Sequence, residues 1–320
     1  MEPQSPCGSK LESQLADVLA CARAPSTTVQ YKGAWAKWKE WTLANKVNYL
    51  PAEPKQVALY LVHVGNSALS FSSIKLVYSS ISWGHNQAGM VSPTLSPLVV
   101  EAIAGLKRLL AKPTIKKEPF QVIDMQKLQG LLVHSCLTDL RNTAMIITAF
   151  FGFLRFDELI RITGSDVVMF ESHVELSIAR SKCDQLRQGS LVVISRLDKF
   201  CPVALLDKYL KAAGDRITPN AFIFRRVEFH KGIKSLSKSN IALSYSNVRD
   251  VVKAKAVQLG LDPSFYGTHS MRAGGSTAAA NSGVEDRLFQ RHGRWSSVTS
   301  KNGYIKDCLA SRLSVTKALV

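Results

Sequence analysis

Apolar side chains recur every three or four residues through the N-terminal third of the chain, which is the spacing of amphipathic helices. With prolines and capping residues at its breaks, this pattern predicts helices over 11–24, 26–41, 51–61, 72–84 and 98–110. The segment 111–119, AKPTIKKEP, then combines prolines and lysines with few apolar side chains, which is typical of a linker. We therefore expect a helical domain over 1–113 and a second domain over 114–320.

The second domain shows a mixed pattern. Helical segments are predicted over 125–135, 138–162, 202–214 and 246–260. Between them Val174, Leu176 and Ile178 alternate with polar or small residues, as in a half-buried strand. The run 191–194 is interpreted as the returning strand across a polar hairpin loop, and 166–170 as a short third strand. The predicted fold class is mainly α with a small antiparallel β-sheet (α+β).

Two basic stretches leave alternatives open. The second predicted helix carries an aromatic stripe that we expect to face the core, formed by Tyr31, Trp35, Trp38 and Trp41. Its interleaved lysines either form a solvated face or contact phosphates. The basic segment 225–240 is interpreted as irregular, either a loop that contacts a polyanion or a plain solvated loop.

The charge of the chain points to a polyanionic partner. The net charge is +17 and the pI about 9.7, and lysines and arginines are spread along the whole length. A folded surface of this kind suits a nucleic acid, because neutralised phosphates release counterions. A basic soluble protein of unrelated function is the alternative that composition alone leaves open.

Cysteine usage and hydropathy favour a soluble intracellular protein. The six cysteines are scattered without a CxxC pair, which argues against a zinc ribbon or a disulfide framework and for a reducing compartment. His134 and Cys136 have no second ligand pair, so we expect no metal site. The N-terminus lacks the apolar run of a signal peptide, and the apolar run 144–154 is too short to span a bilayer.

The segment 267–304 concentrates groups suited to phosphodiester chemistry. His269 and Arg272 stand three residues apart at the start of a predicted helix and so project from one face. Arg272 can hold a non-bridging oxygen, His269 can move a proton, and Tyr304 can attack phosphorus. No carboxylate or histidine cluster resembles a Mg²⁺ or Zn²⁺ nuclease site, so the residues favour metal-free chemistry.

Arg155 adds a second candidate cation. It follows a strongly apolar run, where an arginine is unfavourable unless an anion receives it. The alternative is a structural ion pair with Asp157 or Glu158.

Five motifs in this order resemble those of the tyrosine recombinases, the lambda-integrase and Cre-like family. They are GFLRFDEL at 152–159, Ser181-Lys182 in the hairpin loop, THSMR at 268–272, GRWSS at 293–297 and Tyr304. The resemblance covers the chain from Gln126 onward by motif. By layout it extends to the N-terminal helices, which are similar to the family's core-binding (SAM-like) domain, so the two domains would form a clamp around DNA.

The resemblance implies a role for each matched residue. Arg155 and Arg272 would stabilise the pentavalent phosphorus, and Lys182 would protonate the departing 5′-oxygen. His269 would be the acid–base partner of Tyr304, which would form a 3′-phosphotyrosyl link. No metal, cofactor or ATP is implied.

Two positions near the last motif need separate interpretation. Trp295 stands where many members of the family carry a histidine, and it would pack and hydrogen-bond beside the phosphate. His292, three residues earlier, is interpreted as structural. The candidate DNA contacts are Lys32, Lys37, Lys39, Lys75, Lys107, Arg108, Arg187 and Arg294.

The residues within these motifs are most similar to those of recombinases of eukaryotic mobile elements, of the DIRS, Ngaro or Crypton type. This implies a DNA integrase of a transposable element that acts in the nucleus on double-stranded DNA, without a membrane or small-molecule partner. The tail 305–320 would dock onto a neighbouring protomer, giving a homotetramer on two duplexes. The alternatives are a domesticated, catalytically silent DNA-binding protein and a relaxing type IB topoisomerase; the tail and the compact size argue against the latter.

Overall fold

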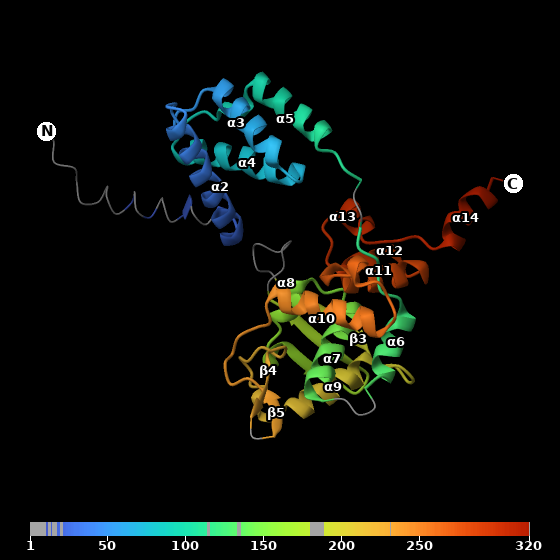
Figure 1. Ribbon diagram of the computed structural model, residues 1–320. Coiled ribbons are helices and arrows are strands. Elements are labelled where there is room, and N and C mark those ends of the chain that lie inside the picture. Colours follow the sequence, from blue (N-terminus) through green and yellow to red (C-terminus); the bar gives the residue numbers. More distant parts are fainter. Residues whose placement is uncertain are drawn as a thin grey trace. The chain divides into compact units, whose positions relative to one another are not determined.

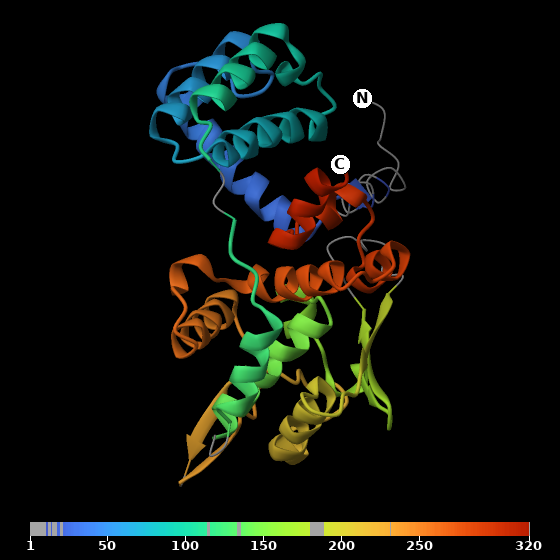
Figure 2. The same ribbon diagram turned by 90° about the vertical axis from the view of Figure 1, so that its right-hand side faces the viewer.

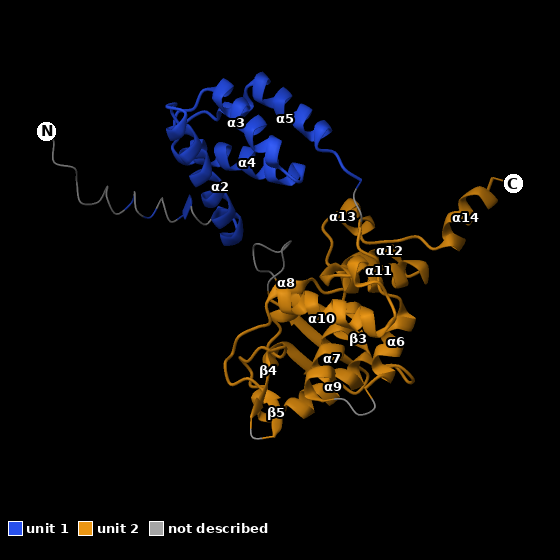
Figure 3. Cartoon of the chain, viewed as in Figure 1, with its two compact units in different colours: residues 1–115 blue, residues 116–320 orange. Residues whose placement is uncertain are grey.

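The computed structural model of the chain describes residues 22–113, 116–132, 136–179, 189–230 and 232–319, together with Leu11, Gln14, Val18 and Leu19. The chain divides into two compact units, Met1–Ile115 and Lys116–Val320 (Figure 3). Its described part is mostly helical with small antiparallel sheets, which confirms the predicted fold class (Figure 1). The assignment of DNA binding to the first unit and of catalysis to the second stays a prediction.

The first unit is a bundle of helices around one apolar core. Its elements are α2 (Pro25–Ala44), α3 (Pro54–Ser67), α4 (Phe71–Gln87), η1 (Pro93–Leu95) and α5 (Pro97–Leu109). Three of the helices begin on a proline, whose missing N–H and fixed φ suit the first helical position. Pro25 therefore starts α2.

The aromatic stripe of α2 faces the core, as expected. Trp38 is fully buried, and its Nε1 donates to the backbone oxygen of Tyr49 at 3.1 Å. Lys32 and Lys37 are exposed on the same helix, while the Nζ of the half-buried Lys39 lies 4.6 Å from the centre of the Tyr49 ring. The lysines thus lie on the solvated side of a helix that is fixed by its aromatic side.

The second unit is built around α7 (Leu137–Phe151), which packs against α9 (Pro202–Ala213) and α11 (Thr268–Asn281). The other helical elements are α6 (Val122–Gly130), α8 (Phe156–Ile160), η2 (Gly164–Asp166), η3 (Gly214–Arg216), α10 (Tyr245–Gln258), η4 (Pro263–Phe265), α12 (Asp286–Gly293), α13 (Val298–Asn302) and α14 (Leu309–Lys317). No helix among the described residues is both long and apolar enough to cross a membrane.

The predicted three-stranded sheet is present. It consists of β1 (Val167–Met169), β2 (His173–Ile178) and β3 (Ser190–Ser195), paired antiparallel in the order β1-β2-β3. Val174 pairs with Ile194 and Leu176 with Val192, so the buried positions of neighbouring strands meet on one face.

The segment 225–240 is not irregular throughout, which corrects the prediction. It contains an antiparallel hairpin of β4 (Val227–His230) and β5 (Ile233–Leu236). Phe229 and Ile233 are 70% and 69% exposed, and only Leu236 of these strands is buried. The sequence therefore lacked the buried period-two signal that indicates a strand. The hairpin lies at the end of the second unit opposite α11 to α13 (Figure 1 and Figure 2).

The apolar run predicted as one helix over 138–162 is broken. Helix α7 ends at Phe151, Gly152 caps it, and Phe153 adopts a left-handed backbone with φ 46° before α8 begins. Arg155 is consequently the N-cap of α8 and not the end of a buried helix. We call residues 152–155 the α7–α8 turn.

Small residues let α11 approach α7 closely. A Cβ on Gly274 would collide with the backbone oxygen of Phe120, and one on Gly275 with that of Phe150. Because no side chain intervenes there, the middle of α11 lies directly against the end of α7 and the α7–α8 turn.

Candidate active site

Arg272 lies where the α7–α8 turn and the end of α12 meet α11. Its side chain is 1% exposed, and its guanidinium donates to the backbone oxygens of Phe153 and Gly293. The guanidinium carbon lies 4.6 Å from the centre of the Trp295 ring. The arginine of the HxxR motif is therefore held rigidly by one carbonyl from each turn.

Glu158 is the carboxylate around which three guanidinium groups gather. Arg155 Nη1 lies 2.7 Å from its Oε1, while Arg294 Nη2 and Arg272 Nη1 lie 2.8 and 3.9 Å from its Oε2. Burial alone would raise the pKa of Glu158, but the charge of Arg294 and the hydrogen bonds and charge of Arg155 lower it to about 2. Glu158 is ionised at neutral pH.

Sequence reasoning missed Glu158 as a member of this cluster. The sequence suggested Glu158 only as one of two alternative ion-pair partners of Arg155. The pair of Arg155 with Glu158 does form, whereas Asp157 is exposed. Its three-residue spacing from Arg155 on a helix start was the available signal. The approach of Arg272 and Arg294 joins residues 114 and 136 positions further on, which no local pattern indicates.

The cluster carries more positive than negative charge. Burial, followed by the charges of Arg155 and Arg294, lowers the pKa of Arg272, although an arginine stays protonated at neutral pH. The Nε of Arg272 is buried without a hydrogen-bond partner among the described residues. Such a site favours an anion, and a phosphate oxygen has the charge and acceptor geometry that guanidinium groups bind best.

Tyr304 follows α13 and lies beside this cluster. Its ring centre is 5.9 Å from that of Trp295 and 6.2 Å from that of His269, and Arg272 Cζ lies 5.0 Å from it. Thr277 of α11 donates to the backbone oxygen of Tyr304 at 3.3 Å. The structure thus brings the two residues of the HxxR motif together with Trp295 and Tyr304.

His269 and Arg272 do not share one environment, although both lie at the start of α11. The His269 side chain is exposed, whereas that of Arg272 points into the protein. His269 therefore lies at the protein surface, whereas Arg272 lies beneath that surface.

Trp295 forms one wall of the site. It is 4% exposed and packs on Phe153 and Phe289, with ring centres 6.2 and 5.1 Å away. A Cβ on Gly293 would collide with its ring, so only glycine permits this packing. The indole Nε1 is buried and has no hydrogen-bond partner among the described residues, which leaves it available to an acceptor.

The His292 side chain forms a structural hydrogen bond to the end of α7. Its Nε2 donates to the backbone oxygen of Phe151 at 2.8 Å, and burial with the charges of Arg294 and Arg272 lowers its pKa. A neutral, hydrogen-bonded imidazole agrees with its interpretation as structural.

The sequence and fold of the chain have relatives. No protein-family model matches the chain. An integrase/recombinase xerD homolog of Selenomonas ruminantium is 27% identical over 291 residues, covering 89% of this chain and 83% of the relative. Recombinase Cre of Escherichia phage P1 is 23% identical over 290 residues, covering 84% and 80%. The chain is thus similar in sequence to tyrosine recombinases over most of its length.

A solved structure extends the likeness to nearly the whole fold of the chain. The Tn1549 transposon integrase, in complex with transposon right end DNA, is similar with a TM-score of 0.60 at 13% identity, covering 96% of this chain and 99% of the integrase. At this identity the likeness concerns the fold alone.

Two predicted site residues, Lys182 and Arg187, fall outside the described residues. Lys182 and Arg187 lie in sequence between β2 and β3, whose last described pair is Ile178 with Ser190. Their roles stay predictions.

The other predicted DNA contacts differ in exposure. Lys75, Lys107 and Arg108 are exposed on the first unit, like Lys32 and Lys37. The Arg294 side chain, in contrast, is 8% exposed and bonded within the arginine cluster.

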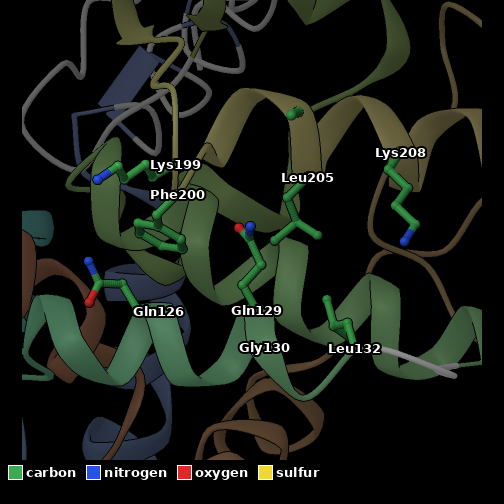
Figure 4. A pocket seen from close by; sticks show the side chains of 9 residues that line it. Gln126, Gln129, Gly130, Leu132, Lys199, Phe200, Leu205 and Lys208 are labelled. Atoms are coloured by element: carbon green, nitrogen blue, oxygen red, sulfur yellow. The ribbon is translucent and has the colours of Figure 1, made fainter.

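The arginine cluster is separate from the groove between α6 and α9. The described residues contain no group of three or more His, Cys, Asp or Glu side chains that could hold a metal ion. A groove of about 630 Å³ lies between α6 and α9 (Figure 4). Its polar lining includes Gln126, Gln129, Lys199 and Lys208, none of which belongs to the motifs of the site.

Proposed function

We propose that this protein is a site-specific DNA recombinase that cuts and rejoins DNA strands through a 3′-phosphotyrosyl intermediate on Tyr304. The observation that carries the proposal is the cluster of three arginines and one carboxylate beside that tyrosine. A buried site with excess positive charge next to a phenol suits a phosphodiester whose charge increases in the transition state.

The proposed chemistry is a transesterification. Arg155 and Arg272 bind the non-bridging oxygens of the scissile phosphate, and Trp295 donates its unpartnered Nε1 to one of them. The phenol oxygen of Tyr304 attacks phosphorus while the bond to the 5′-oxygen breaks. The 5′-hydroxyl of a partner strand later reverses the attack, so the number of phosphodiester bonds is conserved and no ATP is consumed.

Two groups move protons in this proposal. His269, exposed beside Tyr304, exchanges a proton with the phenol, and Lys182 protonates the leaving 5′-oxygen. Proton transfer from a positioned side chain contributes typically ~10²–10⁴-fold to such steps. The role of Lys182 is assigned only from its match to the family motif, because Lys182 lies outside the described residues.

The biological setting forms a further part of the proposal. We infer that the enzyme serves a mobile element of the DIRS, Ngaro or Crypton type and acts in the nucleus. The motif wording supports this, and the solved structure of a transposon integrase is a relative in fold. The first unit would bind one side of the duplex through its exposed lysines.

We also propose a homotetramer on two duplexes, joined by the C-terminal tail. Helix α14 supports this because none of its described residues is buried. Leu309 and Val315 are 70% and 66% exposed, which leaves apolar surface for a neighbouring protomer.

A nicked suicide duplex tests the proposed function. The nick lets the short 5′-ended fragment diffuse away after cleavage, so a covalent protein–DNA adduct accumulates. We expect an adduct that resists denaturation with the wild type and none with Tyr304→Phe, at equal DNA binding. If DNA is bound but no adduct forms on any duplex drawn from the flanking genome, the catalytically silent alternative holds.

A further inference from the structure

The backbone of Arg294 is unusual for the residue it carries. Arg294 caps the C-terminus of α12 in the left-handed region, with φ 56° and ψ 43°. A residue with a Cβ is disfavoured there by roughly 1–2 kcal/mol, and glycine is the usual occupant. An arginine at this position indicates that its side chain makes interactions that outweigh the strain.

The side chain donates four hydrogen bonds to described residues of the protein. Nη1 donates to the backbone oxygens of Gly152 and His292 at 3.2 and 2.7 Å. Nη2 donates to the backbone oxygen of Phe153 at 2.9 Å and to Oε2 of Glu158 at 2.8 Å. The side chain is 8% exposed, so it is almost fully shielded from solvent.

Two of these acceptors also hold the arginines assigned to the phosphate. The backbone oxygen of Phe153 accepts from Arg272 as well, and Glu158 accepts from both Nη1 and the backbone N of Arg155. Arg294 therefore connects the α7–α8 turn, which presents Arg155, to the turn that presents Trp295. A lysine, with its single nitrogen, cannot span acceptors on both turns in this way.

We propose that Arg294 is a positioning residue for strand cleavage, which fixes Arg155 and Arg272 in one arrangement through Glu158 and the Phe153 carbonyl without itself touching DNA. This inference rests on the proposed function. It replaces the sequence-based expectation that Arg294 contacts the phosphate backbone.

The proposal separates binding from chemistry. Loss of the Arg294 side chain should leave DNA affinity and its salt dependence unchanged, since a buried side chain neutralises no phosphate. It should lower the rate of cleavage at saturating DNA, because Arg155 and Arg272 lose their common support. A loss on the order of 100-fold is what a misplacement of reacting groups by about 1 Å can cause.

The variant Arg294→Gly tests this, because glycine favours the left-handed turn and removes only the side chain. Arg291→Gln is the matched control, since Arg291 lies on the same helix and is exposed. The measurements are single-turnover adduct formation on the nicked duplex, the DNA dissociation constant over a series of salt concentrations, and rescue by added guanidinium ion. Arg294→Lys keeps the charge and loses the fork.

We expect slow cleavage with wild-type affinity for Arg294→Gly, partial rescue by guanidinium, and an unchanged maximal rate for Arg291→Gln. An unchanged rate for Arg294→Gly would overturn the proposal, and so would weakened binding with a shallower salt slope. If the wild type forms no adduct, the proposed function fails, and a ¹³C NMR titration of the Glu158 carboxyl then tests separately whether Arg294 holds the arginine cluster together through Glu158. Its pKa should then rise in Arg294→Gly, and an unchanged value contradicts the positioning role.

Discussion

The arginine cluster of the second unit and the basic helices of the first differ in how they carry positive charge. In the cluster, the Arg155, Arg272 and Arg294 side chains are 14%, 1% and 8% exposed and share one buried carboxylate. In the first unit, Lys32 and Lys37 extend into solvent from a helix. In the proposed function both regions bind phosphate groups. The arginines of the cluster do so in a buried site, and the lysines of the first unit do so in solvent.

From this difference in burial we expect the arginine cluster to determine the cleavage rate and the basic helices to determine the DNA affinity. Burying several cations is unfavourable unless fixed acceptors receive them, and once fixed they act strongly on a charge that enters the site. Exposed lysines are screened by salt, and they contribute by counterion release. Variants of the cluster should therefore change chemistry, and variants of the helices should change salt-dependent binding.

The largest expected effect is on cleavage by Arg155→Ala or Arg272→Ala. Each should reduce the single-turnover rate of adduct formation by ~10²–10³-fold, because one electrostatic donor to the developing charge is removed. The measurement uses saturating DNA and a thermal unfolding control for Arg272→Ala, whose guanidinium also binds two carbonyls. Equal rates for Arg155→Ala and wild type would remove Arg155 from the reaction.

Glu158→Gln should change stability with a defined pH dependence. The folded-state pKa of Glu158, about 2, lies below its ordinary value of 4.5, so the carboxylate stabilises the folded state above that value. The contribution, about 3 kcal/mol from the size of this pKa shift, is lost as the pH falls from 4.5 towards 2.

Unfolding by denaturant at a series of pH values measures this effect. The wild type should exceed Glu158→Gln in unfolding free energy at neutral pH, and the difference should shrink as the pH falls below 4.5. A difference that is constant with pH would mean that the Glu158 charge is not held by the arginines.

The smallest expected effect belongs to the helices. Lys32→Gln with Lys37→Gln should weaken DNA binding several-fold, and the slope of log K against log salt should become shallower by about 1 for each phosphate that the variant no longer neutralises. The cleavage rate at saturating DNA should stay unchanged. Lys55→Gln, an exposed lysine on α3 outside the predicted DNA-binding set, serves as the control. A changed maximal cleavage rate for the double variant would show that the lysines of the first unit also contribute to the chemical step.

The sequence predicted much of the local structure of the second unit. The start of α11 with His269 and Arg272 and the three-stranded sheet follow from periodicity and turn signals, whereas Tyr304 was identified from the order of the motifs. These features depend on neighbours in sequence, which a pattern records.

The remaining features depend on contacts between distant segments. The gathering of Arg272 and Arg294 at Glu158 brings together the ends of three helices. The break after Phe151 was missed because apolar residues continue on both sides of Gly152, and an isolated glycine is also tolerated inside a helix. The structural use of Arg294 was hidden because a surface pattern cannot reveal that an arginine adopts a left-handed backbone and turns inward.

In the proposed function, Tyr304 attacks the phosphate that is held by the arginine cluster. The most direct test of this attack is peptide mapping by mass spectrometry of the covalent adduct trapped on a nicked duplex. We predict that the DNA is attached to the peptide that contains Tyr304, through a 3′-phosphate, and that Tyr304→Phe gives no adduct. Attachment to a different residue, or an adduct that persists in Tyr304→Phe, would contradict the account.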